Sequence, residues 1–139
     1  MDNQLPFQSC SFLYVEDDPP SREVIKILLR RVLGTPDITV FEHSADFMQR
    51  IEALPKVPDV ILLDVHIRPD DGFVLLSKLR ASAKYGRACI IAMTASVAFW
   101  DIAVLRKAGF DGLIGKPIQI HLFADRLMSI LSGKPEWTL

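Results

Sequence analysis

Residues 58–64 read Pro-Asp-Val-Ile-Leu-Leu-Asp, a run of four apolar residues that ends directly in a carboxylate. A short apolar run bounded by turn residues indicates a strand that is buried on both faces. Residues 12–15, Phe-Leu-Tyr-Val, repeat the pattern and end in Glu16, Asp17 and Asp18. Such strands are typical of parallel sheets, because helices cover both faces of those sheets.

Outward from these two runs, strand-like and helix-like segments alternate along the chain. Further strands are predicted over residues 38–41, 89–93 and 112–115. Apolar residues at helical spacing predict helices over residues 21–33, 44–54, 73–81, 97–108 and 118–131. The first helix is expected to bury Val32, and Ser44 is expected to cap the second. Because parallel strands need crossover connections, the pattern predicts an α/β fold, a doubly wound five-stranded parallel sheet with five helices.

Composition limits both the size and the class of the protein. The chain has 139 residues, which suit one domain, and 50% of them are hydrophobic, which excludes a disordered chain. Its 16 basic and 17 acidic residues nearly cancel, and the Lys and Arg residues are scattered. A general nucleic-acid binder needs a basic patch, so we expect no nucleic-acid partner. The two cysteines indicate neither a disulfide framework nor a metal cluster.

Neither a secretory signal nor a membrane span is expected. The N-terminus has no basic start followed by a long apolar stretch, which favours a cytoplasmic protein. Residues 88–105 carry Asp101 as their only charge and just reach the length of a membrane span. Thr94 and Ser96 interrupt this segment, and helical spacing begins after Ser96. We therefore predict a buried strand followed by a helix there.

Chemically distinctive residues stand where the predicted strands end. Glu16 and Asp17 follow the first strand, Asp64 the third, Thr94 the fourth and Lys116 the fifth. Singly, such residues are typical of helix caps or of solvated surface charges. Doubly wound sheets bind ligands beyond the carboxyl ends of their strands, so the set together predicts a functional site.

The residue types at these strand ends indicate a metal and a nucleophile. Three converging carboxylates repel one another unless a cation joins them, and oxygen ligands without His or Cys favour Mg²⁺ or Mn²⁺. The same cation, together with Lys116, would offset the repulsion when the Asp64 carboxylate attacks a phosphoryl group. The Thr94 hydroxyl would donate a hydrogen bond to a phosphoryl oxygen.

Over residues 11–132 the chain resembles the receiver domain of bacterial two-component response regulators, the CheY-like family. The resemblance rests on FLYVEDD at residues 12–18, PDVILLD at 58–64, the Asp-Gly turn at 71–72, Met-Thr-Ala at 93–95 and Gly-Lys-Pro at 115–117. It implies the CheY-like, flavodoxin-like strand order 2-1-3-4-5, with short tails at residues 1–10 and 133–139.

The resemblance also implies residue roles. Asp64 would accept a phosphoryl group from a histidine kinase or a phosphotransfer protein, and the protein would catalyse only its own phosphorylation and dephosphorylation. Thr94 and Lys116 would contact that group, and the Lys116–Pro117 peptide would be cis. The implied metal-binding residues are Glu16 (through water), Asp17, Asp64 and the main-chain carbonyl of His66.

In several positions the chain departs from the family pattern or varies within it. Arg68 stands where the family usually has Pro, and Pro69 follows one residue later. Leu113 stands where the family commonly has a Tyr or Phe switch residue, so any switching would use aliphatic packing. His66 and Ser96 occupy the positions that flank the attacking water in the family.

Only seven residues follow residue 132, which predicts output through a changed surface. The surface expected to change is that of the fourth helix, the fifth strand and the fifth helix, read by an unknown downstream protein. The helix over residues 97–108 has apolar residues on both sides, with Val104 and Leu105 opposite Phe99 and Ile102. We hypothesise a partner or homodimer surface made of Phe99, Trp100, Ile102 and Leu113. Alternatively, the aromatic residues fold back over the sheet edge.

Two other functions use similar residues. A haloacid-dehalogenase-type phosphatase also has an Asp nucleophile, Mg²⁺, Thr and Lys, but it needs a second Asp where this chain has His66. An unphosphorylated pseudo-receiver would serve only as a scaffold. The complete set of acids, Thr and Lys argues against a pseudo-receiver, whereas Arg68 and Leu113 leave that alternative open.

Overall fold

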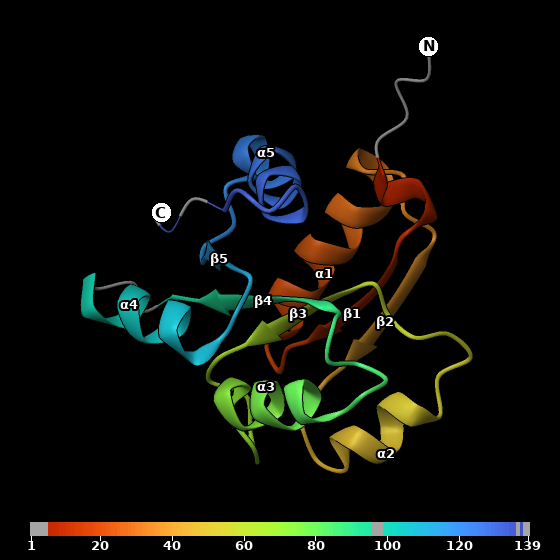
Figure 1. Cartoon of the computed structure of the whole chain (residues 1–139). Helices are drawn as coiled ribbons and strands as arrows, with labels where there is room; N and C mark the ends of the chain where they lie inside the picture. Colours follow the sequence, from red (N-terminus) through yellow and green to blue (C-terminus); the bar gives the residue numbers. More distant parts are fainter. Residues whose placement is uncertain (1–5, 96–98, 136, 138–139) are drawn as a thin grey trace.

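The computed structural model describes residues 6–95, 99–135 and 137. Its strands form one parallel sheet in the order β2-β1-β3-β4-β5, which lies at the centre of the molecule (Figure 1). This confirms the predicted fold class and strand order. The strands are β1 (Ser11–Val15), β2 (Asp37–Phe41), β3 (Val60–Asp64), β4 (Cys89–Thr94) and β5 (Gly112–Gly115).

Helices cover both faces of the sheet. Figure 1 shows α1 and α5 on one face, α2 and α3 on the other, and α4 beside β5. Because side chains alternate along a strand, Phe12 and Tyr14 enter the core under α1 and α5, whereas Leu13 and Val15 enter the opposite core. The helical segments are η1 (Pro6–Ser9), α1 (Pro19–Ile27), η2 (Leu28–Val32), α2 (Phe47–Glu52), α3 (Gly72–Ala81), α4 (Phe99–Ala108) and α5 (Ile120–Leu131).

The first helix differs from its predicted form at both ends. It begins at Pro19, because the Asp18 carboxylate accepts a hydrogen bond from the Ser21 amide and caps the helix. Its last turn, η2, is a π-helix, which has more residues per turn than an α-helix. The wider turn rotates the later side chains, so Val32 is 52% exposed and Leu33 is buried instead. The predicted burial of Val32 was wrong.

The apolar segment over residues 88–105 forms a strand and then a helix, as predicted. It contains β4, which is buried in the sheet, and the start of α4; Ser96 lies outside the described residues. Within the described part of the chain, no helix combines the length and the apolar character needed to cross a bilayer.

Candidate functional site

The residues at the strand ends meet at one edge of the sheet. Parallel pairing places Asp64 beside Met93 and Thr94 beside Gly115, so the carboxyl ends of β3, β4 and β5 lie in register. Asp64 and Thr94 are buried. Glu16, Asp17 and Lys116 directly follow β1 and β5 at the same edge. The structure therefore brings together all of the strand-end residues that the sequence singled out.

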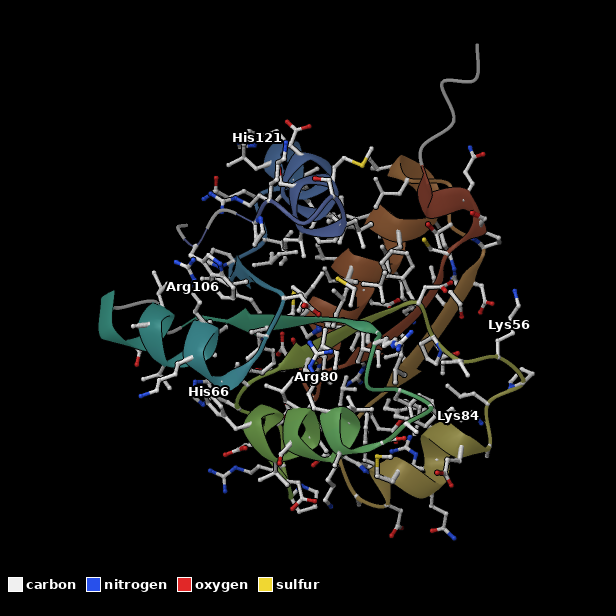
Figure 2. All side chains as sticks on the ribbon, viewed as in Figure 1. Lys56, His66, Arg80, Lys84, Arg106 and His121 are labelled. Atoms are coloured by element: carbon white, nitrogen blue, oxygen red, sulfur yellow. The ribbon has the colours of Figure 1, made fainter. Side chains whose placement is uncertain are left out.

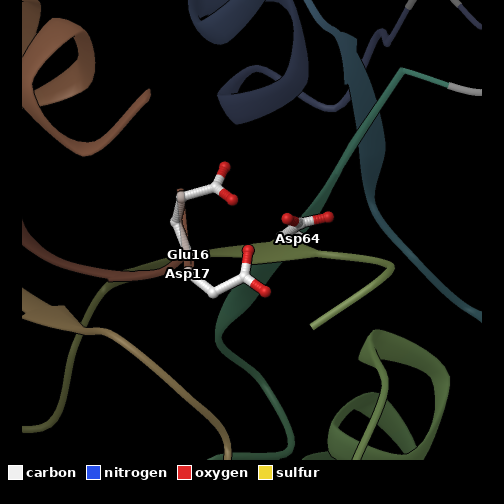
Figure 3. Close-up of side chains that lie close together, drawn as sticks. All are labelled: Glu16, Asp17 and Asp64. Atoms are coloured by element: carbon white, nitrogen blue, oxygen red, sulfur yellow. The ribbon is translucent and has the colours of Figure 1, made fainter. Parts of the chain in front are cut away.

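The three carboxylates converge on one small space. Glu16, Asp17 and Asp64 each offer an oxygen atom, and these atoms all lie within 4.8 Å of one another. Figure 3 shows Glu16 and Asp17 reaching from the end of β1 toward Asp64 on β3. Glu16 is fully buried, whereas Asp17 is exposed. This set of oxygen ligands, open on one side, suits a hard divalent cation such as Mg²⁺.

Lys116 is shared between two of these carboxylates. Its Nζ lies 2.8 Å from Glu16 Oε1 and 3.3 Å from Asp64 Oδ2. Burial lowers the pKa of Lys116, but hydrogen bonds and charge from Glu16 and Asp64 outweigh this effect and raise the pKa above its ordinary value. Lys116 is therefore a cation at neutral pH and neutralises part of the acidic cluster.

Glu16 also has a partner that the sequence reasoning missed. The Tyr14 hydroxyl donates to Glu16 Oε1 at 2.8 Å, and the Asp18 amide faces Glu16 Oε2 at 3.3 Å. Burial raises the pKa of the Glu16 carboxyl and the Asp64 carboxylate raises it further, although Lys116 and Tyr14 act in the opposite direction. The two-residue period of a strand places Tyr14 and Glu16 on the same face, and this signal was available from the sequence.

The loop between β3 and α3 holds Asp64 from its other side. The His66 amide donates to Asp64 Oδ1 at 3.0 Å, while the His66 side chain lies exposed at the surface near α4 (Figure 2). Gly72, the first residue of α3, lies close to the backbone at the end of β3. A Cβ atom at this residue would lie 2.9 Å from Val65 Cα and 3.1 Å from the Asp64 carbonyl oxygen. A side chain at residue 72 would therefore displace the backbone that carries Asp64.

Ser44 fastens this same loop and does not cap α2, so the predicted cap was wrong. The α2 N-cap is Asp46, and the Ser44 hydroxyl is buried against Asp70. Ser44 Oγ donates to the Asp70 carbonyl at 2.6 Å and accepts from the Asp70 amide at 2.7 Å. The Ser44 amide donates to the Arg68 carbonyl at 3.0 Å. The bend at Arg68 and Pro69, where the chain departs from the expected pattern, is thus tied to the end of β2.

Two proline peptide bonds near the site are cis. The Lys116–Pro117 bond is cis, as expected. The Arg68–Pro69 bond is also cis, and nothing in the sequence indicated this. The chain therefore places its proline one residue later than the usual pattern and adopts a cis bend there.

Comparison with known proteins agrees with this geometry. The family model for the response regulator receiver domain matches residues 12–128. The chain belongs to this family. The receiver domain is 32% identical over 120 residues to the nitrate/nitrite response regulator protein NarL of Escherichia coli, covering 86% of this chain and 52% of NarL. It therefore spans about half the length of that relative.

Shorter relatives match the receiver domain over most of their length. A chemotaxis protein CheY homolog of Campylobacter jejuni is 30% identical over 86% of this chain and 90% of its own. A putative response regulator from Chloroflexus aurantiacus has the same fold, with a TM-score of 0.78 at 23% identity, covering 88% of this chain and 98% of that one. The chemotaxis response regulator CheY4 of Vibrio cholerae gives a TM-score of 0.76 at 18% identity, covering 87% and 98%.

The expected partner surface of the receiver domain needs correction. Leu113 is fully buried in the core under α3 and α4, so it cannot belong to an exposed surface. Ile102 is only partly exposed and packs against the same core, whereas Val104 is 55% exposed. For Phe99 and Trp100 the structure describes the backbone but not the side chains, so their place in the expected surface stays a prediction. Leu113 is buried because its strand is covered on both faces, which is the rule for parallel sheets.

Proposed function

We propose that this receiver domain accepts a phosphoryl group on Asp64 from a histidine kinase or a phosphotransfer protein. The observation that carries the proposal is the arrangement of Asp64: one of its oxygens lies within 4.8 Å of an oxygen of each of two further carboxylates, and its Oδ2 lies 3.3 Å from Lys116 Nζ. An aspartate that only carries its own negative charge would not need a lysine and a cation site beside it. An aspartate that becomes a doubly charged acyl phosphate needs cationic groups around it to offset the added negative charge.

The chain's own residues divide the work of the transfer. An Asp64 carboxylate oxygen forms a bond to phosphorus as the bond between phosphorus and the donor imidazole nitrogen breaks, and the imidazole leaves with that electron pair. The His66 amide holds Asp64 Oδ1 at 3.0 Å and so orients the carboxylate. Lys116 turns from its present partners to an oxygen of the phosphoryl group. The buried hydroxyl of Thr94 lies at the same sheet edge and contacts another.

Mg²⁺ or Mn²⁺ fits the donor set described above. Glu16, Asp17, Asp64 and the main-chain carbonyl of His66 would hold it, with Glu16 acting through water. When bound, the metal offsets negative charge on the phosphoryl oxygens. The protein would then be a signalling protein that acts on itself and would not turn over other substrates.

The proposal is tested by incubating the wild-type protein with acetyl phosphate. With Mg²⁺, we expect the protein to gain the mass of one phosphoryl group in intact-mass spectrometry. Chelation of the metal with EDTA should abolish the gain, because the carboxylates then repel the incoming anion. No gain at any Mg²⁺ concentration would favour the scaffold alternative. Hydrolysis of many added phosphate monoesters per protein would favour the phosphatase alternative.

We also propose that the receiver domain works as a stand-alone cytoplasmic response regulator. The CheY homolog of similar extent, covered over 90% of its length, supports this form. Output would pass through the exposed side of α4 together with α5 to a downstream protein or a second copy of the chain. Val104 at 55% exposure supplies apolar surface there. We propose no direct contact with nucleic acid, since basic residues are scattered along the chain.

If α4 mediates self-association, Val104→Asp is expected to keep the protein monomeric after phosphorylation, because a charge opposes burial of the exposed apolar surface at that residue. The wild-type protein should double its mass in solution under the same conditions. Light scattering coupled to size exclusion measures both masses. A wild-type mass that stays monomeric with and without phosphorylation would contradict self-association and leave the downstream protein as the partner.

A further inference from the structure

Tyr14 is a polar side chain inside an otherwise apolar core. It lies in β1 and is fully buried beneath α1 and α5. Its ring packs in a cluster with Phe12, Ile25, Leu62 and other apolar residues, and a phenylalanine ring would fill the same space. The distinctive part of Tyr14 is therefore its hydroxyl, which needs a hydrogen-bond partner when buried.

That partner is the carboxylate of Glu16. Two donors converge on Glu16 Oε1 at the same distance of 2.8 Å, the Tyr14 hydroxyl from inside the core and Lys116 Nζ from the site. The Asp18 amide, at 3.3 Å from Glu16 Oε2, is a longer contact. A fully buried carboxylate is costly unless such donors compensate for the water it has lost.

Lys116 contacts two carboxylates in this structure, and phosphorylation of Asp64 would change how strongly it is attracted to each. Its Nζ is closer to Glu16 than to Asp64, at 2.8 Å and 3.3 Å. A phosphoryl group on Asp64 concentrates more negative charge than a carboxylate and attracts the lysine. As Lys116 moves toward that group, Glu16 loses its ammonium partner but remains buried. The Tyr14 hydroxyl comes from the other side of Glu16 and does not have to move.

We propose that Tyr14 is a positioning residue of the phosphorylation site, whose hydroxyl keeps Glu16 in place when Lys116 moves to the phosphoryl group. This inference rests on the function proposed above. It assigns to Tyr14 a larger role in the phosphorylated state than in the free state, because Lys116 also holds Glu16 in the free state. A merely structural tyrosine would contribute equally to both.

The difference between the two states is measured with Tyr14→Phe, which removes only the hydroxyl. Beryllofluoride with Mg²⁺ is used as a mimic of the phosphoryl group on Asp64. The affinity of the protein for beryllofluoride is obtained by NMR titration. We expect Tyr14→Phe to weaken beryllofluoride binding about tenfold, the effect of one hydrogen bond to a charged group. The affinity for Mg²⁺ alone should change by less than about twofold, since Lys116 still holds Glu16.

Tyr85→Phe is the matched control. Tyr85 is the other large buried tyrosine, and its hydroxyl has no hydrogen-bond partner among the described residues. It lies in the core on the opposite face of the sheet. Its variant should bind both Mg²⁺ and beryllofluoride as the wild type does, and thermal unfolding of both variants reports whether the fold is intact.

The outcomes separate this inference from the proposed function. If the wild-type protein binds no beryllofluoride, the proposed function fails. If the wild type binds it and Tyr14→Phe binds it equally well, or loses Mg²⁺ and beryllofluoride to the same degree, the role of Tyr14 is overturned. If Tyr14→Phe does not fold, a measurement on the wild-type protein decides: the rate at which the Tyr14 hydroxyl proton exchanges with water, observed by NMR with and without beryllofluoride. Slower exchange with beryllofluoride bound than without it supports the inference, and exchange that is equal in the two states or faster with beryllofluoride overturns it.

Discussion

Asp64→Asn is expected to gain no phosphoryl group from acetyl phosphate and Mg²⁺ under conditions in which the wild-type protein gains one. The asparagine amide is neutral and is a poor nucleophile toward phosphorus, so the loss should be complete. The fold should survive, because asparagine has nearly the same shape and the bond between Lys116 and Glu16 at 2.8 Å does not depend on Asp64. Intact-mass spectrometry and thermal unfolding measure the two effects.

Asp70→Asn is the matched control for this loss. Asp70 lies in the same loop, pairs with Lys78 at 3.2 Å and has a side chain that is 41% exposed. Its main-chain bonds to Ser44 do not involve the carboxylate, so the loop should keep its shape. We expect this variant to be labelled as the wild type is. Equal labelling of Asp64→Asn and the wild type would refute the assignment of Asp64.

Arg80→Gln is expected to lower the free energy of unfolding by about 3 kcal/mol, the cost of breaking a partly buried ion pair with its hydrogen bonds. Arg80 Nη1 donates to the carbonyls of Gly86 and Ala88 at 3.0 Å each. Arg80 Nη2 donates to the Gly109 carbonyl at 2.9 Å and to Asp111 at 2.7 Å. One side chain, 28% exposed, thus joins the end of α3 to the two loops that lead into β4 and β5 (Figure 2).

Urea unfolding measures this difference, and Arg87→Gln serves as the control. Arg87 is exposed in the loop before β4, so its replacement should change the free energy of unfolding by less than about 0.5 kcal/mol. Asp111 also accepts the Ile90 amide at 2.8 Å, so its carboxylate keeps one partner in Arg80→Gln. If both variants unfold at the same urea concentration as the wild type, the bonds of Arg80 add no net stability.

The strands could be predicted to within one residue, because buried parallel strands are continuous apolar runs with polar ends. Apolar spacing located each helix but not its ends: the second helix was predicted over residues 44–54 and runs over Phe47–Glu52, and the last was predicted from residue 118 and begins at Ile120. The exposure of Val32 could not be predicted, since the spacing argument assumes a regular α-helix and η2 is a π-helix. The placement of Leu113 on an exposed surface was wrong, although its burial follows from a sheet that is covered on both faces.

The composition of the candidate site could also be predicted, but its long-range hydrogen bonds could not. Glu16, Asp17, Asp64, Thr94 and Lys116 come together because parallel strands end at the same edge. The role of Ser44 was missed because its partner lies 26 residues further along the chain, in a loop with no periodic pattern. Local capping rules suggested a nearer partner for it.

By itself, the sequence determined the order of strands and helices and the residue types at each strand end, since both depend on local periodicity and on chain direction. The tertiary structure decided which donor serves each buried acid. Lys116 meets Glu16 across 100 residues, and Tyr14 reaches the same oxygen from inside the core. The bond from Lys116 joins segments that are remote in the sequence, and only packing brings those segments within hydrogen-bond distance. Tyr14 is a near neighbour of Glu16 in the chain, but only the burial of both residues directs the Glu16 carboxylate to the Tyr14 hydroxyl.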